Sequence, residues 1–136
     1  MERAAKRAME GWRPDARDVA LRQEAGRMAR VEPLLRDLIE ALGSNGTARL
    51  LDADRGQVSR WNSGAETISA GMARRIVDLH DVLSRILRLY QPRVAAAWLV
   101  GSEPLLRGAR PIDILALEGV APVIEAIDGI AAGVFA

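Results

Sequence analysis

Apolar residues return at every third or fourth position along residues 69–90, which is the spacing of one face of an α-helix. The members of this stripe are Met72, Ile76, Leu79, Leu83, Ile86, Leu87 and Tyr90. A second stripe of the same kind begins near Val31 and runs to Leu42, where Gly43 follows. Strand signals are weak, because β-branched residues are sparse and two-residue alternation never persists. The sequence therefore predicts an all-α fold.

Turn residues divide the rest of the chain into shorter helices. Gly64 is positioned to end one of them, and Gln91-Pro92 breaks the chain after the long helix. The shorter helices are expected near residues 15–30, 47–51, 55–63, 94–99, 112–117 and 120–132. We therefore predict an arm over 1–30, a module over 31–90 and a second module over 91–136, with the long helix as a shared strut.

The composition limits what the chain can do. Cysteine is absent, which excludes disulfides and thiolate metal sites and favours a cytoplasmic location. No apolar run approaches the ~20 residues of a membrane span, so no membrane partner is expected. His80 is the single histidine, and no serine is arranged to use it as a relay. We expect a binding protein with no catalytic residues, no metal and no cofactor.

Charge is distributed unevenly along the chain. Residues 1–30 carry a net charge of +3 and residues 31–99 a net charge of +1, whereas residues 100–136 carry −3. A basic N-terminal part suits nucleic acid, and an acidic C-terminal part suits a basic protein surface. The alternative is a chance distribution of charge over solvated helix faces.

The segment from Thr47 to Trp61 has the features of two short helices that cross at a tight turn. Ala48 is small enough to lie at the crossing, and Asp52 is a residue type that tolerates a left-handed turn. Asp54 and Gln57 have the spacing of a capping box at the start of the second helix. The apolar contacts between the two helices are expected from Leu51, Ala53, Val58 and Trp61. This pattern predicts a helix-turn-helix.

The outward face of the second helix carries polar side chains suited to DNA. These are Arg55, Gln57, Ser59, Arg60 and Asn62. Arginine and glutamine match the edges of guanine and adenine in the major groove, and serine and asparagine can donate to phosphates, as can the nearby Arg49, Arg74 and Arg75. The local charge is modest, so a homodimer on operator DNA is expected. The alternative is a helical corner without DNA binding.

This segment resembles the Xre-like regulators. Their second helix commonly reads Ser/Asp-x-x-x-Val/Ile-Ser-x-Trp-x-x-Gly. Here the matching residues are Asp54, Val58, Ser59, Trp61 and Gly64.

The C-terminal part carries a second ordered set of features. Ala97-Trp98-Leu99 is followed by Pro104-Leu105 and then by Arg110-Pro111-Ile112-Asp113-Ile114-Leu115. This order resembles the Xre/MbcA/ParS toxin-binding domain, so the likeness covers roughly residues 31–136. Glu103 stands where that family has asparagine, Arg107 replaces a glycine, and Arg110 comes one position late.

The resemblance implies a type II antitoxin. Its partner would be a cognate RES-domain toxin that consumes NAD, and the C-terminal helix and tail would block the toxin's active site within a larger hetero-oligomer. The residues expected at the toxin are Arg110, Glu125, Asp128, Gly133, Val134, Phe135 and Ala136. Further acids that could face a basic dinucleotide cleft are Glu103, Asp113 and Glu118.

Two alternatives remain open at this point. Gly133-Val134 can be read as a helix cap in which the glycine is left-handed, as well as part of an anchor at the toxin. The chain can also be a stand-alone Xre-like transcriptional regulator whose C-terminal module only dimerises.

Overall fold

The computed structural model describes residues 31–134, and it is all-α over that range. The predicted arm over 1–30 and the tail residues Phe135 and Ala136 lie outside the described residues. The elements are α3 (Val31–Leu51), α4 (Arg55–Ser63), α5 (Ala70–Ile86), α6 (Pro92–Val100), the 3-10 turn η1 (Pro104–Leu106), α7 (Pro111–Glu118) and α8 (Val120–Val134). Residues 31–134 contain no strand, which confirms the predicted fold class.

Helix α3 consists of two arms joined at Gly43. The backbone there has φ 76° and ψ 168°, so the helix axis changes direction at this one residue. The Thr47 hydroxyl donates to the Gly43 carbonyl over 2.8 Å, and the Thr47 side chain is completely buried. The sequence pattern predicted that the next helix begins near residue 47. That prediction was wrong, because Gly43 alone makes the break and residues 44–46 are already helical.

The turn between α3 and α4 is built from two aspartates. Asp52 adopts the left-handed conformation with φ 53°, and Ala53 then donates its N–H to the Ala48 carbonyl. Asp54 caps α4 by accepting a 2.6 Å hydrogen bond from the Gln57 N–H. Gly64 ends α4 in a left-handed conformation. The predicted bounds of α4, the left-handed conformation of Asp52 and the end of the helix at Gly64 are therefore confirmed.

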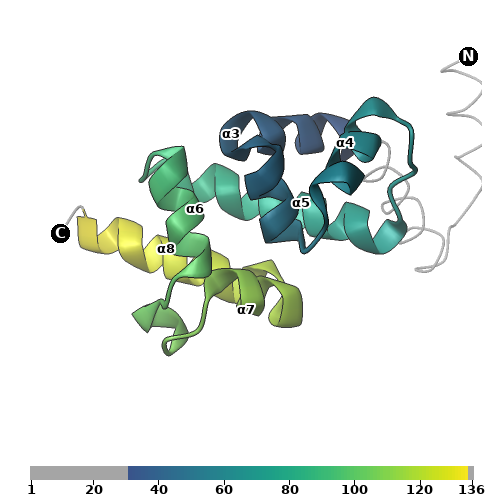
Figure 1. Cartoon of the computed structure of the whole chain (residues 1–136). Coiled ribbons are helices and arrows are strands. Elements are labelled where there is room, and N and C mark those ends of the chain that lie inside the picture. The colour runs from purple at the N-terminus through teal and green to yellow at the C-terminus, as the bar shows by residue number, and fades with distance from the viewer. Residues whose placement is uncertain (1–30, 135–136) are drawn as a thin grey trace, which may run out of the picture.

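Helix α5 lies at the centre of the molecule, with α3 and α4 on one side and α7 and α8 on the other (Figure 1). Ser69 caps its start by accepting from the Met72 N–H. The helix ends at Ile86, short of the predicted Tyr90, because the N–H groups of Arg88 and Leu89 donate three residues back, to the Arg85 and Ile86 carbonyls. The face that it buries is formed by Ala73, Ile76, Leu79, Val82, Leu83 and Ile86.

Of the C-terminal helices, α7 and α8 pack against α5, whereas α6 packs against α3 and α7. Pro111 occupies the first turn of α7, one residue before the predicted start, and α8 packs against α5, α7 and η1. One hydrophobic core extends from Leu35 in α3 through α5 to Leu99 in α6 and Val123 in α8. Within residues 31–134, none of the helices combines the length and the apolar character that crossing a bilayer requires.

Candidate functional site

Helix α4 turns a polar face outward and an apolar face inward. Val58 and Trp61 are buried at 0% and 3% exposure, so they fix which side of the helix faces the core. Of the residues predicted to contact DNA, the structure exposes all but one on the outer side, and Gln57 is half-buried. The five residues predicted from the sequence thus lie on one short helix and share its outer surface.

Arg60 is held by the loop that follows α4. Its Nε lies 3.4 Å from Oε1 of Glu66, and the Glu66 N–H donates to the Arg60 carbonyl over 3.1 Å. The Ser63 hydroxyl also donates to that carbonyl. The sequence reasoning did not single out Glu66. The available signal was an acid placed just beyond Gly64, the glycine that turns the chain back along the helix.

The three arginines expected near phosphates have different surroundings. Arg75 Nη1 donates to the Leu51 carbonyl over 3.2 Å, so this side chain ties α5 to the end of α3. Arg49, Arg74 and Arg75 are all exposed and line a cleft between α3, α5 and α7. Arg75 therefore supports the turn before α4.

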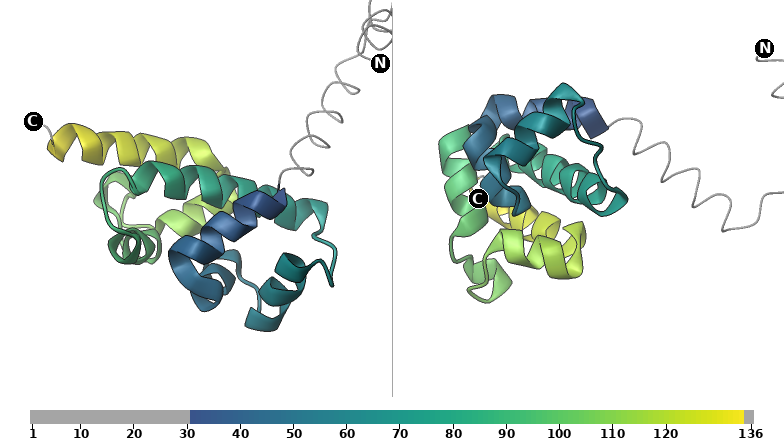
Figure 2. Two further views of the ribbon diagram at one scale, coloured as in Figure 1. Left: turned by 90° about the horizontal axis from the view of Figure 1, so that it is seen from above. Right: turned by 45° about the vertical axis from the view of Figure 1, so that its right-hand side comes forward.

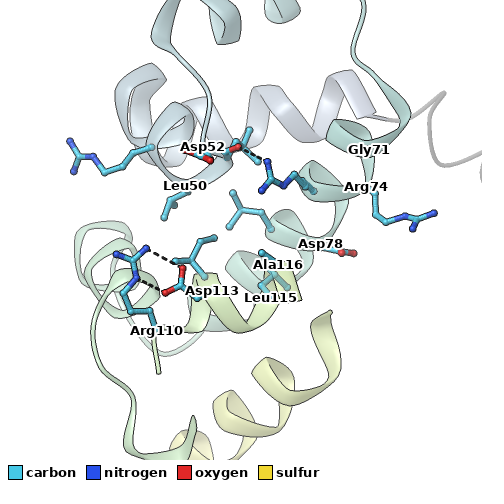
Figure 3. Close-up of a pocket in the computed structure, with 14 residues that line it drawn as sticks. Leu50, Asp52, Gly71, Arg74, Asp78, Arg110, Asp113, Leu115 and Ala116 are labelled. Atoms are coloured by element: carbon cyan, nitrogen blue, oxygen red, sulfur yellow. Dashed lines mark hydrogen bonds and ion pairs between the residues drawn. The ribbon is translucent and has the colours of Figure 1, made fainter. Parts of the chain in front are cut away.

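That cleft has a volume of about 390 Å³ and contains Arg110, which the sequence assigned to the toxin-binding surface. Figure 3 shows Arg110 paired with Asp113 on α7, opposite Leu50 and Asp52 at the end of α3. The pair is bidentate, with Nε–Oδ2 and Nη2–Oδ1 distances of 3.0 and 3.3 Å. No residue of α8 lines this cleft. The structure thus groups Arg110 with the α3–α4 turn.

Helix α8 presents an exposed acidic side. Glu125 and Asp128 are exposed, whereas Ala126 and Ile127 are buried against the core. Gly133 is exposed inside α8 and is absent from the residues with positive φ. The cap interpretation of Gly133 was therefore wrong, because the helix continues through that residue. Phe135 and Ala136, assigned to the same surface, lie outside the described residues.

Glu103 corrects another expectation. Its side chain was counted among the acids offered to a partner, but the residue is only 7% exposed. It accepts hydrogen bonds from Trp98 Nε1 at 2.6 Å and from the Leu105 N–H at 2.9 Å. The carboxylate therefore organises the loop between α6 and η1.

His80 joins α5 to α3 through Asp37. Its Nε2 lies 2.9 Å from Asp37 Oδ2, and Ser84 Oγ lies 3.5 Å from Nδ1. Ser84 lies beside the ring, and its hydroxyl donates to the His80 carbonyl over 2.7 Å. The proton of the Ser84 hydroxyl is thus engaged by the helix backbone. Among residues 31–134, no group of three or more potential metal ligands comes together.

The outer face of α4 and the C-terminal end of α8 lie at opposite ends of the molecule (Figures 1 and 2). Comparison of the chain with protein-family models, with curated proteins and with solved structures found no match. The chemistry of the two surfaces is therefore the basis for inferring what they bind.

Proposed function

We propose that this protein is a type II antitoxin that binds operator DNA through α4 and inhibits a cognate RES-domain, NAD-consuming toxin through α8 and the residues after it. The observation that carries the proposal is the separation of two chemically different surfaces on one continuous core. A protein with this arrangement can hold both partners at once. Repression of its own operon then follows from the DNA-binding end.

The exposed side of α4 supports the DNA-binding part. The N-terminal cap of α4 and its buried Val58 and Trp61 fix the orientation of the helix. The outward side chains are therefore oriented for contact with a DNA groove. Arg60 and Gln57 supply paired donors and acceptors that match base edges. Two copies of the chain would double this limited contact area on a palindromic operator.

The acidic side of α8 supports the toxin-binding part. A toxin that consumes NAD must bind an anionic dinucleotide, so its active-site cleft is expected to be basic. Glu125 and Asp128 are exposed and carry the complementary charge. The resemblance of residues 97–115 to the toxin-binding domain of Xre/MbcA/ParS antitoxins adds to this interpretation.

The test is to express the chain together with the product of the gene adjacent to its own. The full chain should form a complex with that product and protect cells, whereas a chain without residues 133–136 should still bind DNA but fail to protect.

Glu125→Gln and Asp128→Asn should each weaken toxin binding by about threefold to tenfold. The matched control is Glu40→Gln, an exposed acid on α3 and not on α8, which should change nothing. Full protection by the shortened chain would contradict the proposed role of the C-terminal end.

A second candidate is a stand-alone Xre-like regulator that dimerises through its C-terminal module. The exposed side of α6 favours it, because Val94 and Val100 are 49% and 37% exposed there. A stable dimer that binds DNA and forms no complex with the adjacent gene product would select this function over the first. Sedimentation of the full chain, alone and with that product, distinguishes the two.

A further inference from the structure

We infer that Glu66 and Gly56 are positioning residues that hold the Arg60 guanidinium for reading a base edge, and that they set the sequence discrimination of α4. This inference rests on the proposed DNA binding. It adds two residues that do not lie among the predicted base contacts. Each of the two residues is expected to raise the ratio of the affinities for matching and non-matching DNA.

Glu66 holds Arg60 from the side. The contact joins Glu66 Oε1 to Arg60 Nε at 3.4 Å, and the backbone hydrogen bond from the Glu66 N–H to the Arg60 carbonyl fixes where the carboxylate stands. Because Glu66 engages Nε, the two terminal Nη groups of Arg60 remain for a pair of acceptors. The O6 and N7 atoms of guanine form such a pair. The Arg60 and Glu66 side chains are 50% and 35% exposed, so a groove can reach them.

Gly56 leaves room for the guanidinium on the surface of α4. Side chains on a helix lean toward its N-terminus, which carries Arg60 back over the residue one turn earlier. A Cβ at position 56 would lie 3.1 Å from Arg60 Nη1 and 3.3 Å from Asp54 Oδ1. Both distances are tighter than ordinary contacts. The Arg60 tip is flexible and can move away, whereas Asp54 Oδ1 is held by its hydrogen bond from the Gln57 N–H. Glycine at this position thus keeps Arg60 in its place.

The charge of Glu66 has a second consequence. A carboxylate next to the groove repels phosphates wherever the protein touches DNA, so it weakens binding to every sequence. Its support of Arg60 acts only where the matching base is present. Glu66 therefore lowers general affinity while it raises discrimination, which is how specificity by repulsion works.

The experiment uses the full chain and the duplex that it enriches from a random-sequence pool, together with a scrambled version of that duplex. Glu66→Gln should bind the scrambled duplex about twofold to fivefold more tightly, and the ratio of the two affinities should fall by roughly threefold to tenfold. In a chain that already carries Arg60→Ala, adding Glu66→Gln should leave the ratio unchanged, because the residue it positions is gone. Glu40→Gln is the control for loss of one negative charge at a distance.

Gly56→Ala separates positioning from folding. Alanine favours the helix while its Cβ crowds the Asp54 cap, so the melting temperature should change by no more than about 2–5 °C in either direction. The affinity ratio should nevertheless fall, because Arg60 is displaced. A purely structural role for Gly56 predicts unchanged or better binding.

The outcomes distinguish a failure of the positioning role from a failure of the proposed DNA binding. If the unchanged chain enriches no duplex, the DNA-binding proposal fails. If it enriches one, and both Glu66→Gln and Gly56→Ala keep the full affinity ratio, DNA binding stands and the positioning role is overturned.

Discussion

Glu103 shows how a single buried carboxylate can organise a loop. Its two oxygens accept from Trp98 Nε1 and from the Leu105 N–H, so both strong acceptors of the group are used inside the protein. The same loop is closed by the Gly108 N–H, which donates to the Glu103 carbonyl. An acid at this position therefore satisfies two donors within the chain.

Replacing Glu103 with alanine should lower the free energy of unfolding by about 1–3 kcal/mol, because the Trp98 indole N–H and the Leu105 N–H lose their acceptor. Glu103→Gln keeps one acceptor oxygen and should cost less. Urea unfolding of the two variants measures both changes. Equal stability of the alanine variant and the unchanged chain would show that these hydrogen bonds contribute nothing net.

At the scale of elements, the sequence predicted best where the signal was local. The bounds of α4 follow from Asp54 and Gly64, and both residues act on neighbours within one turn. The end of α5 and the burial of Glu103 depend on backbone turns and side-chain hydrogen bonds over two to five residues, and the spacing of apolar residues cannot show those. Glu66 was missed for the same reason, since its contact with Arg60 needs the reversal of the chain after α4.

Gly43 controls the shape of α3, and Gly43→Ala should lower the free energy of unfolding by about 1–3 kcal/mol. The space around it is empty, with no atom within 4 Å of an added Cβ, so the cost comes from the left-handed φ of 76° alone. The control is Gly71→Ala in α5, where the site is equally open and the backbone is helical. That change should be neutral or stabilise the chain by up to about 1 kcal/mol. Urea unfolding of the pair tests the difference, and equal stabilities would contradict it.

At the scale of the whole molecule, the two proposed binding ends share one core. Helix α5 packs against α3 on one side and against α8 on the other. Completely buried side chains continue from Val58 on α4, through Ile76 on α5, to Val123 on α8. The DNA end and the toxin end are thus predicted to be mechanically joined, and a loss of packing at one should weaken the other.

Val123→Ala tests that connection. The side chain is completely buried, so its truncation should cost about 1–3 kcal/mol. With fluorinated tryptophan in the full chain, the ¹⁹F resonances of Trp61 and Trp98 report the α4 end and the α6 end separately. Because one core joins these ends, both resonances should lose native intensity at the same urea concentration, and Val123→Ala should lower that concentration equally for both.

Val94→Ala is the matched control, since the same two methyl groups are removed from a side chain that is 49% exposed. Its effect should stay within about 0.5 kcal/mol. If Val123→Ala moves the Trp98 transition and leaves that of Trp61 in place, the two ends unfold independently. The shared core would then not couple them, and binding at one end would have no route through packing to the other.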